Sequence, residues 1–127
     1  MDSTARIKYL RIALIICGLA FICLSPLMIL WPSGWRWIPQ QQNYEQMIVV
    51  IYIVLGIFLI FAAKDPLQNV SLIWFTVWSS LAHGGVMLVQ ALVYPHEHGH
   101  LIGDVPALLL IGIILGLLTP RGKATKE

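Results

Sequence analysis

The sequence predicts an all-α integral membrane protein, a four-helix bundle with its N- and C-termini in the cytoplasm. The chain is 58% hydrophobic and only 11% charged, and its mean hydropathy is +0.81. A soluble domain carries about 25% charged residues, so this composition is typical of a membrane protein. Four apolar segments and their three connections account for nearly all of the 127 residues. We therefore expect a single domain, 1–127.

The first predicted span covers about residues 12–30 and follows the basic residues Arg6, Lys8 and Arg11. Its apolar run is longer than the about 7–15 residues typical of a signal peptide. We interpret this segment as a retained signal-anchor helix. Pro26 near its far end is expected to kink the helix or thin it locally.

The other three predicted spans cover about residues 47–63, 70–94 and 101–119. In the last span, Asp104 is expected to be the N-cap, with Pro106 in the first helical turn, where its missing N–H costs nothing. A helix that began after Asp104 would be short for an apolar core about 30 Å thick.

The basic residues predict the orientation of the spans. The N-terminal segment, the turn at Lys64 and the C-terminal tail with Arg121, Lys123 and Lys126 hold seven of the eight Lys and Arg residues, and the other two loops hold only Arg36. The positive-inside rule places the richer side in the cytoplasm. We expect a multi-pass protein of the cell inner membrane, with lipid as its first partner.

Aromatic side chains gather in the first outer connection. Trp31, Trp35, Trp37 and Tyr44 fall near the predicted outer interface of the membrane. Trp and Tyr are enriched at both membrane interfaces. We interpret this Trp-rich segment as a headgroup anchor and not as a ligand site.

A polar stripe runs along the third predicted span. At about 100° per residue, its members fall within roughly 60° of His83. They are Thr76, Ser79, Ser80, His83, Met87, Gln90 and Tyr94. A polar face against lipid would be costly, so this face is expected to contact protein or water. Either its side chains hydrogen-bond neighbouring helices, or His83, Met87, Gln90 and Tyr94 line a pocket open to the outside.

The last connection is rich in histidine and acidic residues. They are His96, Glu97, His98, His100 and Asp104. Imidazole with carboxylate suits Zn, Cu or Ni, and short His-rich tracts are a metal-binding composition. Solvation of a short loop and proton sensing are the alternatives. We hypothesise that these residues, together with Glu45, Gln90 and Tyr94, form an outer vestibule with His83 at its floor.

The string from His96 to His100 formally fits the H-E-x-x-H motif of zinc hydrolases. That motif requires a helix, and the connection that holds Pro95 and Gly99 is expected to be too short for one. A zinc-dependent hydrolase acting through His96, Glu97 and His100 is therefore the last of the candidate functions.

Two glycines of the fourth span, Gly112 and Gly116, form a G-x-x-x-G pattern. Small residues at this spacing let helices approach closely. The pattern indicates packing either within the bundle or against another copy of the chain.

The pattern Trp78-Ser79, His83-Gly84-Gly85-Val86-Met87 and Gln90, followed by a polar loop and a glycine-bearing span, resembles a bacterial family of small four-span membrane proteins. That family is known only as a domain of unknown function. The resemblance implies a helical membrane protein and no catalytic residue.

Three classes of function remain. The first is a non-catalytic accessory or oligomer-forming protein with a polar face around His83, acting alone or in a larger membrane complex. The second is a binding protein for a transition metal or a small, quinone-like amphiphile. The third is an enzyme or transporter, which ranks last because no nucleophile–base pair or phosphate loop is present. The small net charge of +2 indicates no nucleic-acid partner.

Overall fold

The computed structural model describes residues 3–37, 39 and 41–121. Within these ranges all regular secondary structure is helical, with no strand. Lys123 and Lys126 of the predicted cytoplasmic tail lie outside the described residues. The elements in chain order are α1 (Ser3–Ile22), α2 (Leu24–Leu30), α3 (Pro32–Trp35), α4 (Gln42–Ala62), α5 (Val70–Val93), the 3₁₀ helix η1 (Pro95–Ile102) and α6 (Asp104–Leu118).

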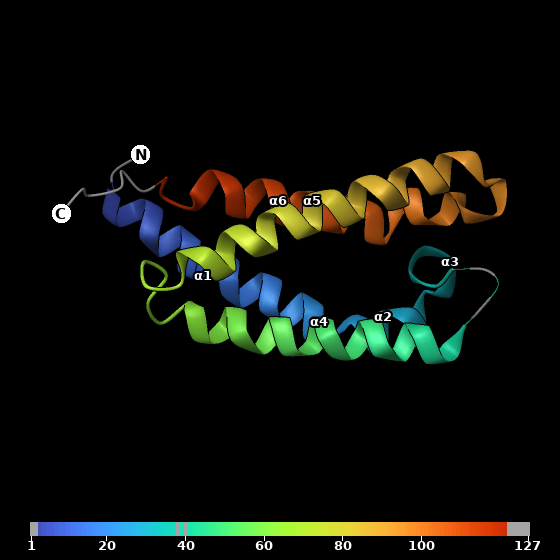
Figure 1. Ribbon diagram of the computed structural model, residues 1–127, viewed down its shortest axis with the longest axis horizontal. Coiled ribbons are helices and arrows are strands. Elements are labelled where there is room, and N and C mark those ends of the chain that lie inside the picture. Colours follow the sequence, from blue (N-terminus) through green and yellow to red (C-terminus); the bar gives the residue numbers. More distant parts are fainter. Residues whose placement is uncertain (1–2, 38, 40, 122–127) are drawn as a thin grey trace.

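The long helices form two hairpin-like layers that lie side by side (Figure 1). One layer pairs α1 with α4, and the other pairs α5 with α6. The two layers meet where α1 packs against α6, and at the opposite end α3 packs against η1. The start of α1 and the end of α6 therefore lie at one end of the molecule, and α3 and η1 lie at the other.

Two of the helices, α4 and α5, are each long and apolar enough to cross a membrane. The pair α1 and α2, bent by 54°, and the pair η1 and α6, bent by 41°, also qualify if each bent pair counts as one span. The described part of the chain therefore contains two to four candidate spans. The bend expected near Pro26 is present between α1 and α2, and the last predicted span, 101–119, begins within η1 and continues as α6.

The break in the first predicted span lies at Cys23, between α1 and α2. Pro26 has no backbone N–H, and its ring collides with the carbonyl of the residue four positions earlier, which is Ile22. Helix α1 ends at that residue. The helix also begins at Ser3, well before the predicted residue 12, because Lys and Arg are good helix formers although they lower the hydropathy.

The break in the fourth predicted span lies at Gly103, between η1 and α6. A β-carbon on Gly103 would overlap the carbonyl of Gly34, so this glycine allows η1 to touch α3. Asp104 is the first residue of α6 and not its N-cap, and no side chain caps this helix. The expectation that the connection after Pro95 is too short for a helix was also wrong.

Glycine allows close contact within each layer. A β-carbon on Gly56 would lie 2.5 Å from the carbonyl oxygen of Gly18, so the backbones of α1 and α4 are nearly in contact there. In the second layer, a β-carbon on Gly112 would lie 2.6 Å from Leu81 of α5, and one on Gly116 would lie 3.3 Å from Val77. The glycine pair of α6 thus faces α5 of the same chain.

Arg6 joins the first helix to the last. Its guanidinium donates hydrogen bonds to the carbonyls of Leu117, Leu118 and Thr119, each at 2.9 Å. The last carbonyls of a helix have no partners within the helix and carry its negative partial charge, so a cation there is stabilising. This contact holds α1 beside the end of α6.

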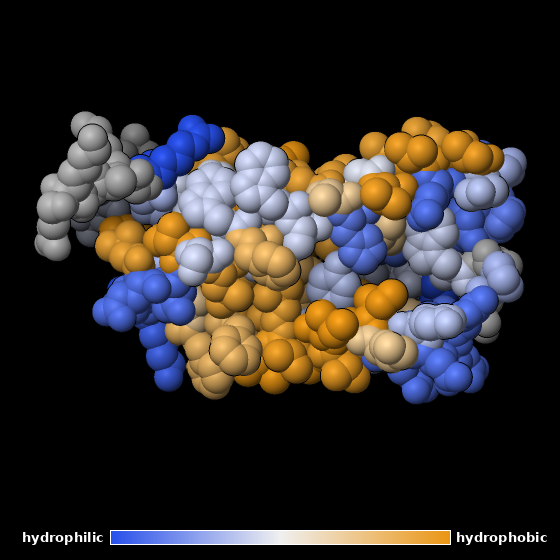
Figure 2. Space-filling view, in the orientation of Figure 1, coloured by the Kyte–Doolittle hydropathy of each residue, from blue (hydrophilic) through white to orange (hydrophobic). Residues whose placement is uncertain are grey.

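Large apolar side chains cover the outer surface, as Figure 2 shows over the middle of the molecule. Hydrophilic side chains gather toward the end that carries α3 and η1. Ile51, Phe75, Trp78 and Leu117 are each about two-thirds exposed. A soluble monomer rarely presents so much contiguous apolar surface, whereas a membrane protein presents it to lipid.

We predict that Gly56→Ala destabilises the protein by about 1–3 kcal/mol, because its methyl group meets the Gly18 carbonyl and overpacks the contact between α1 and α4. Gly85→Ala is the matched control, since nothing lies within 4 Å of a β-carbon there. Unfolding of both variants in mixed micelles measures the difference. Equal stabilities would contradict the close approach of the two helices.

Candidate functional site

His83 of α5 and Tyr52 of α4 form a hydrogen-bonded pair between the two layers. The Tyr52 hydroxyl lies 2.5 Å from Nδ1 of His83, and the ring centroids are 5.8 Å apart. Both residues are half-buried. Phe21 of α1 packs against the Tyr52 ring with a centroid distance of 4.9 Å. The pair therefore connects helices from different layers through their side chains.

The inner part of the predicted stripe turns toward protein. Thr76, Ser80 and Met87 are buried, and His83 contacts Tyr52. The hydroxyl groups do not link helices, however. Thr76 donates to the Leu72 carbonyl of its own helix at 2.9 Å. Such bonds within one turn satisfy a hydroxyl locally.

The other stripe residues lie apart from this pair. Ser79 donates to the carbonyl of Thr76 in its own helix at 3.3 Å. Gln90 and Tyr94, at the outer end, are exposed. The stripe thus divides into a protein-facing part around His83 and an outward-facing part at Gln90 and Tyr94.

A cavity of about 130 Å³ lies between the layers beside the His83–Tyr52 pair. Its walls come from both layers and are mainly apolar. They include Phe21, Leu24, Met28, Val49, Met87 and Leu108. Four further side chains with polar groups line it, namely Trp35, Trp37, Glu45 and Asp104. Of the outer residues in the predicted vestibule, Glu45 and Asp104 border the cavity, together with His83.

Two polar atoms in the wall of the cavity are enclosed by protein without a hydrogen-bond partner among the described residues: the indole nitrogen Nε1 of Trp35 and the carboxylate oxygen Oε1 of Glu45. The other oxygen of Glu45 accepts two hydrogen bonds from Arg36, at 2.7 and 3.1 Å. An unpaired buried group costs about 1–3 kcal/mol.

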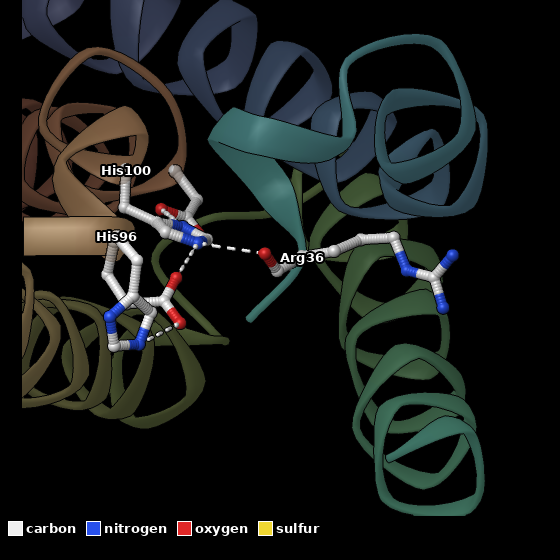
Figure 3. A network of polar contacts seen from close by, with 5 residues as sticks. Arg36, His96 and His100 are labelled. Atoms are coloured by element: carbon white, nitrogen blue, oxygen red, sulfur yellow. Dashed lines mark hydrogen bonds and ion pairs between the residues drawn. The ribbon is translucent and has the colours of Figure 1, made fainter. Parts of the chain in front are cut away.

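A second polar network lies next to the cavity, where η1 meets the segment after α3 (Figure 3). His100 is completely buried. Its Nδ1 lies 2.8 Å from Asp104, and its Nε2 lies 3.1 Å from the Arg36 carbonyl and 3.2 Å from Glu97. The ring of Trp37 stacks on the imidazole at 4.1 Å. In Figure 3 the Arg36 carbonyl points toward His100, and its guanidinium extends away from it.

This network occupies both ring nitrogens of His100. The Arg36 carbonyl can only accept, so Nε2 carries a hydrogen, and Nδ1 is bound to the Asp104 carboxyl group. Neither nitrogen then offers a free lone pair to a metal ion. The imidazole instead links η1, α6 and the segment that follows α3.

The 3₁₀ conformation also separates the residues of the formal zinc motif. Residues three apart share a face of a 3₁₀ helix, which brings Glu97 and His100 together. Residues four apart do not, so His96 and His100 point differently. His96 is 55% exposed and lies 3.6 Å from Glu97, whereas His100 is buried. His98 is exposed.

Within the described ranges, no group of three or more His, Cys, Asp or Glu residues is placed to hold a metal ion. The predicted site of His96, Glu97, His98, His100 and Asp104 is thus not assembled in this geometry. Binding of Zn, Cu or Ni stays a prediction without structural support.

The sequence reasoning overlooked Tyr52, Trp35 and Trp37. Tyr52 is the only side chain of the 47–63 segment that can form a strong hydrogen bond, and this property alone marked it as a partner for His83. Trp35 and Trp37 were assigned to the headgroup region, but they turn inward and line the cavity. Only Trp31 and Tyr44 of that aromatic group are exposed.

Residues 4–126 match the sequence model of a protein family that is described as a family of unknown function (DUF6632). The chain belongs to this family. The match covers both helical layers, the cavity and the outer network, and it confirms the predicted membership of a family of unknown function. No curated protein and no solved structure gives a match.

We predict that His100→Ala lowers the free energy of unfolding by about 3–5 kcal/mol, because it leaves the buried Glu97 and Asp104 carboxyl groups without their common partner. His98→Ala, which removes an exposed ring from the same helix, is expected to change it by less than about 0.5 kcal/mol. Thermal unfolding in detergent compares the two variants. Equal losses would contradict a supporting role for His100.

Proposed function

We propose that this protein is a non-catalytic, four-span membrane protein that binds a small amphiphile in the cavity between its two helical layers. The observation that carries this proposal is the mainly apolar cavity with the His83–Tyr52 pair in its wall. Binding sites for small molecules are usually concave and apolar, with a few convergent polar groups that orient the ligand.

The position of the cavity supports the proposal. Residues from α1, α2, α4, α5 and α6 all contribute to its walls. Tyr52 and His83 come from opposite layers, so a molecule beside this pair contacts both layers at once. A ligand that binds only the folded arrangement stabilises it. This property suits an accessory protein that senses or carries a membrane-soluble compound.

The size of the cavity limits the bound part of the ligand. An engineered protein cavity of about 150 Å³ accommodates benzene, and the volume here is about 130 Å³. The cavity therefore suits a single six-membered ring or a short branched chain, with any longer tail extending into the bilayer.

We also propose that the bent pairs α1–α2 and η1–α6 each complete a crossing, so that both termini lie in the cytoplasm. Arg6 and Lys64 are near one end of the helices. Arg36, the single Lys or Arg that the described residues place near the other end, is paired with Glu45. This distribution follows the positive-inside rule and supports a cytoplasmic position of both termini, and the inner membrane as the location is part of the same proposal.

For the binding function, we predict that protein extracted from its native membrane retains a small amphiphile and that Ala107→Leu reduces its amount at least tenfold. Ala107 lines the cavity, so the three added carbon atoms fill space that the ligand needs. Ala82→Leu adds the same atoms to an exposed position of α5 and is expected to retain the ligand. Mass spectrometry of organic extracts compares the three proteins. A wild-type protein without a ligand, or equal retention in the two variants, would contradict the proposal.

For the orientation, we predict that the new thiol of Tyr44→Cys reacts with a membrane-impermeant maleimide added to intact cells. The new thiol of Lys64→Cys is expected to react only after the cells are permeabilised, because the turn after α4 faces the cytoplasm. Both variants are made in a chain in which Cys17 and Cys23 are replaced by Ser. The reverse labelling pattern would overturn the proposed orientation.

A further inference from the structure

The His83–Tyr52 hydrogen bond determines which group His83 offers to the cavity. If the Tyr52 hydroxyl donates to Nδ1, the single hydrogen of a neutral imidazole lies on Nε2. If Nδ1 donates instead, the Tyr52 hydroxyl hydrogen and the Nε2 lone pair both lack partners in the described part of the chain. Donation by Tyr52 leaves only the Nε2 hydrogen of His83 without a partner among the described residues, whereas donation by Nδ1 leaves both the Tyr52 hydroxyl hydrogen and the Nε2 lone pair without one. Donation by Tyr52 is therefore favoured.

The Nε2 atom of His83 is available to a ligand. It has no hydrogen-bond partner among residues 3–37, 39 and 41–121, and it is not one of the enclosed polar atoms. The unpaired atoms of Trp35 and Glu45 are enclosed by protein, so a ligand cannot reach them without a side-chain movement. His83, which lines the cavity, therefore offers an accessible N–H donor to a ligand.

The charges around the cavity favour a neutral ligand. The two acidic residues in its wall, Glu45 and Asp104, are held by Arg36 and His100 respectively. An anionic ligand would bring its charge close to these carboxyl groups in an apolar surrounding whose walls, among the described residues, hold no Lys or Arg side chain, which is unfavourable. An ammonium group carries only donors and cannot accept the hydrogen of Nε2.

From these observations we infer that the cavity takes a neutral, six-membered ring that bears a carbonyl-type oxygen, and that this oxygen accepts a hydrogen bond from Nε2 of His83. The ring fills the space beside Phe21, Met87 and Leu108. The class includes the ring of an oxidised quinone and other cyclic ketones. This inference rests on the proposed binding function and specifies its ligand.

The test uses three rings of similar size: cyclohexanone, methylcyclohexane and cyclohexanecarboxylate. Each is titrated into the full chain in nanodiscs, and affinity is expressed relative to the concentration in the bilayer. We expect cyclohexanone to bind about three- to tenfold more tightly than methylcyclohexane. This difference in affinity corresponds to the free energy of one neutral hydrogen bond. The carboxylate is expected to bind most weakly.

Nitrogen NMR of the His83 imidazole gives a second readout on the wild-type protein. The hydrogen is expected on Nε2, and cyclohexanone is expected to shift the Nε2 resonance more than methylcyclohexane does. In His83→Leu the preference for cyclohexanone is expected to disappear while methylcyclohexane still binds. If that variant does not fold, Tyr52→Phe is used, with the exposed Tyr44→Phe as its control. Tyr52→Phe removes the hydrogen bond to Nδ1 of His83, so its preference for cyclohexanone over methylcyclohexane is expected to fall. Tyr44→Phe is expected to keep that preference.

The outcomes separate the two proposals. If none of the three rings binds, the proposed function fails together with this inference. If cyclohexanone and methylcyclohexane bind equally, or if the carboxylate binds best, the cavity is a binding site but the acceptor inference is overturned. A hydrogen found on Nδ1 also overturns it.

Discussion

The hydrogen bond between Tyr52 and His83 is the interaction on which the arrangement of the cavity depends. Polar side chains inside a membrane protein are stable only with partners, because lipid supplies none. The only strongly hydrogen-bonding side chain of the 47–63 segment meets the only histidine of α5. Since they come from different layers, this bond fixes the distance between the layers beside the cavity, where apolar contacts alone leave the register less defined.

The outer network has a comparable role at the end that carries α3 and η1. Arg36 acts there through both of its parts: its carbonyl accepts from His100 of η1, and its guanidinium binds Glu45 of α4. The stacking of Trp37 on His100 adds an aromatic contact. The segment after α3 is thereby attached to both layers, and Trp35 and Trp37 are held against the cavity. Within the histidine-rich connection, His100 therefore has a structural role, whereas His96 and His98 are exposed.

The sequence predicted α5 to within one residue at its end, because a long apolar run is bounded by Asn69 and Pro95. It predicted a kink near Pro26 but not that α1 ends as early as Ile22, and it did not predict the break at Gly103. The first depends on a proline that acts four residues upstream, and the second depends on contact with Gly34, which is distant in the chain. Periodicity also marked His83 as inward-facing, but it cannot identify a partner on another helix. The composition of the 47–63 segment marks Tyr52 as a candidate partner, whereas the inward position of Trp35 and Trp37 depends on how the layers assemble.

The contact of Arg6 with the end of α6 joins residues 111 to 113 positions apart. During synthesis, Arg6 emerges from the ribosome long before its partners, so it stays without them until α6 has been made. Closure of the molecule by this contact is consequently a late assembly step. Contacts of such high sequence separation slow folding, and the interval before closure is the period in which membrane chaperones and proteases have access to an incomplete fold.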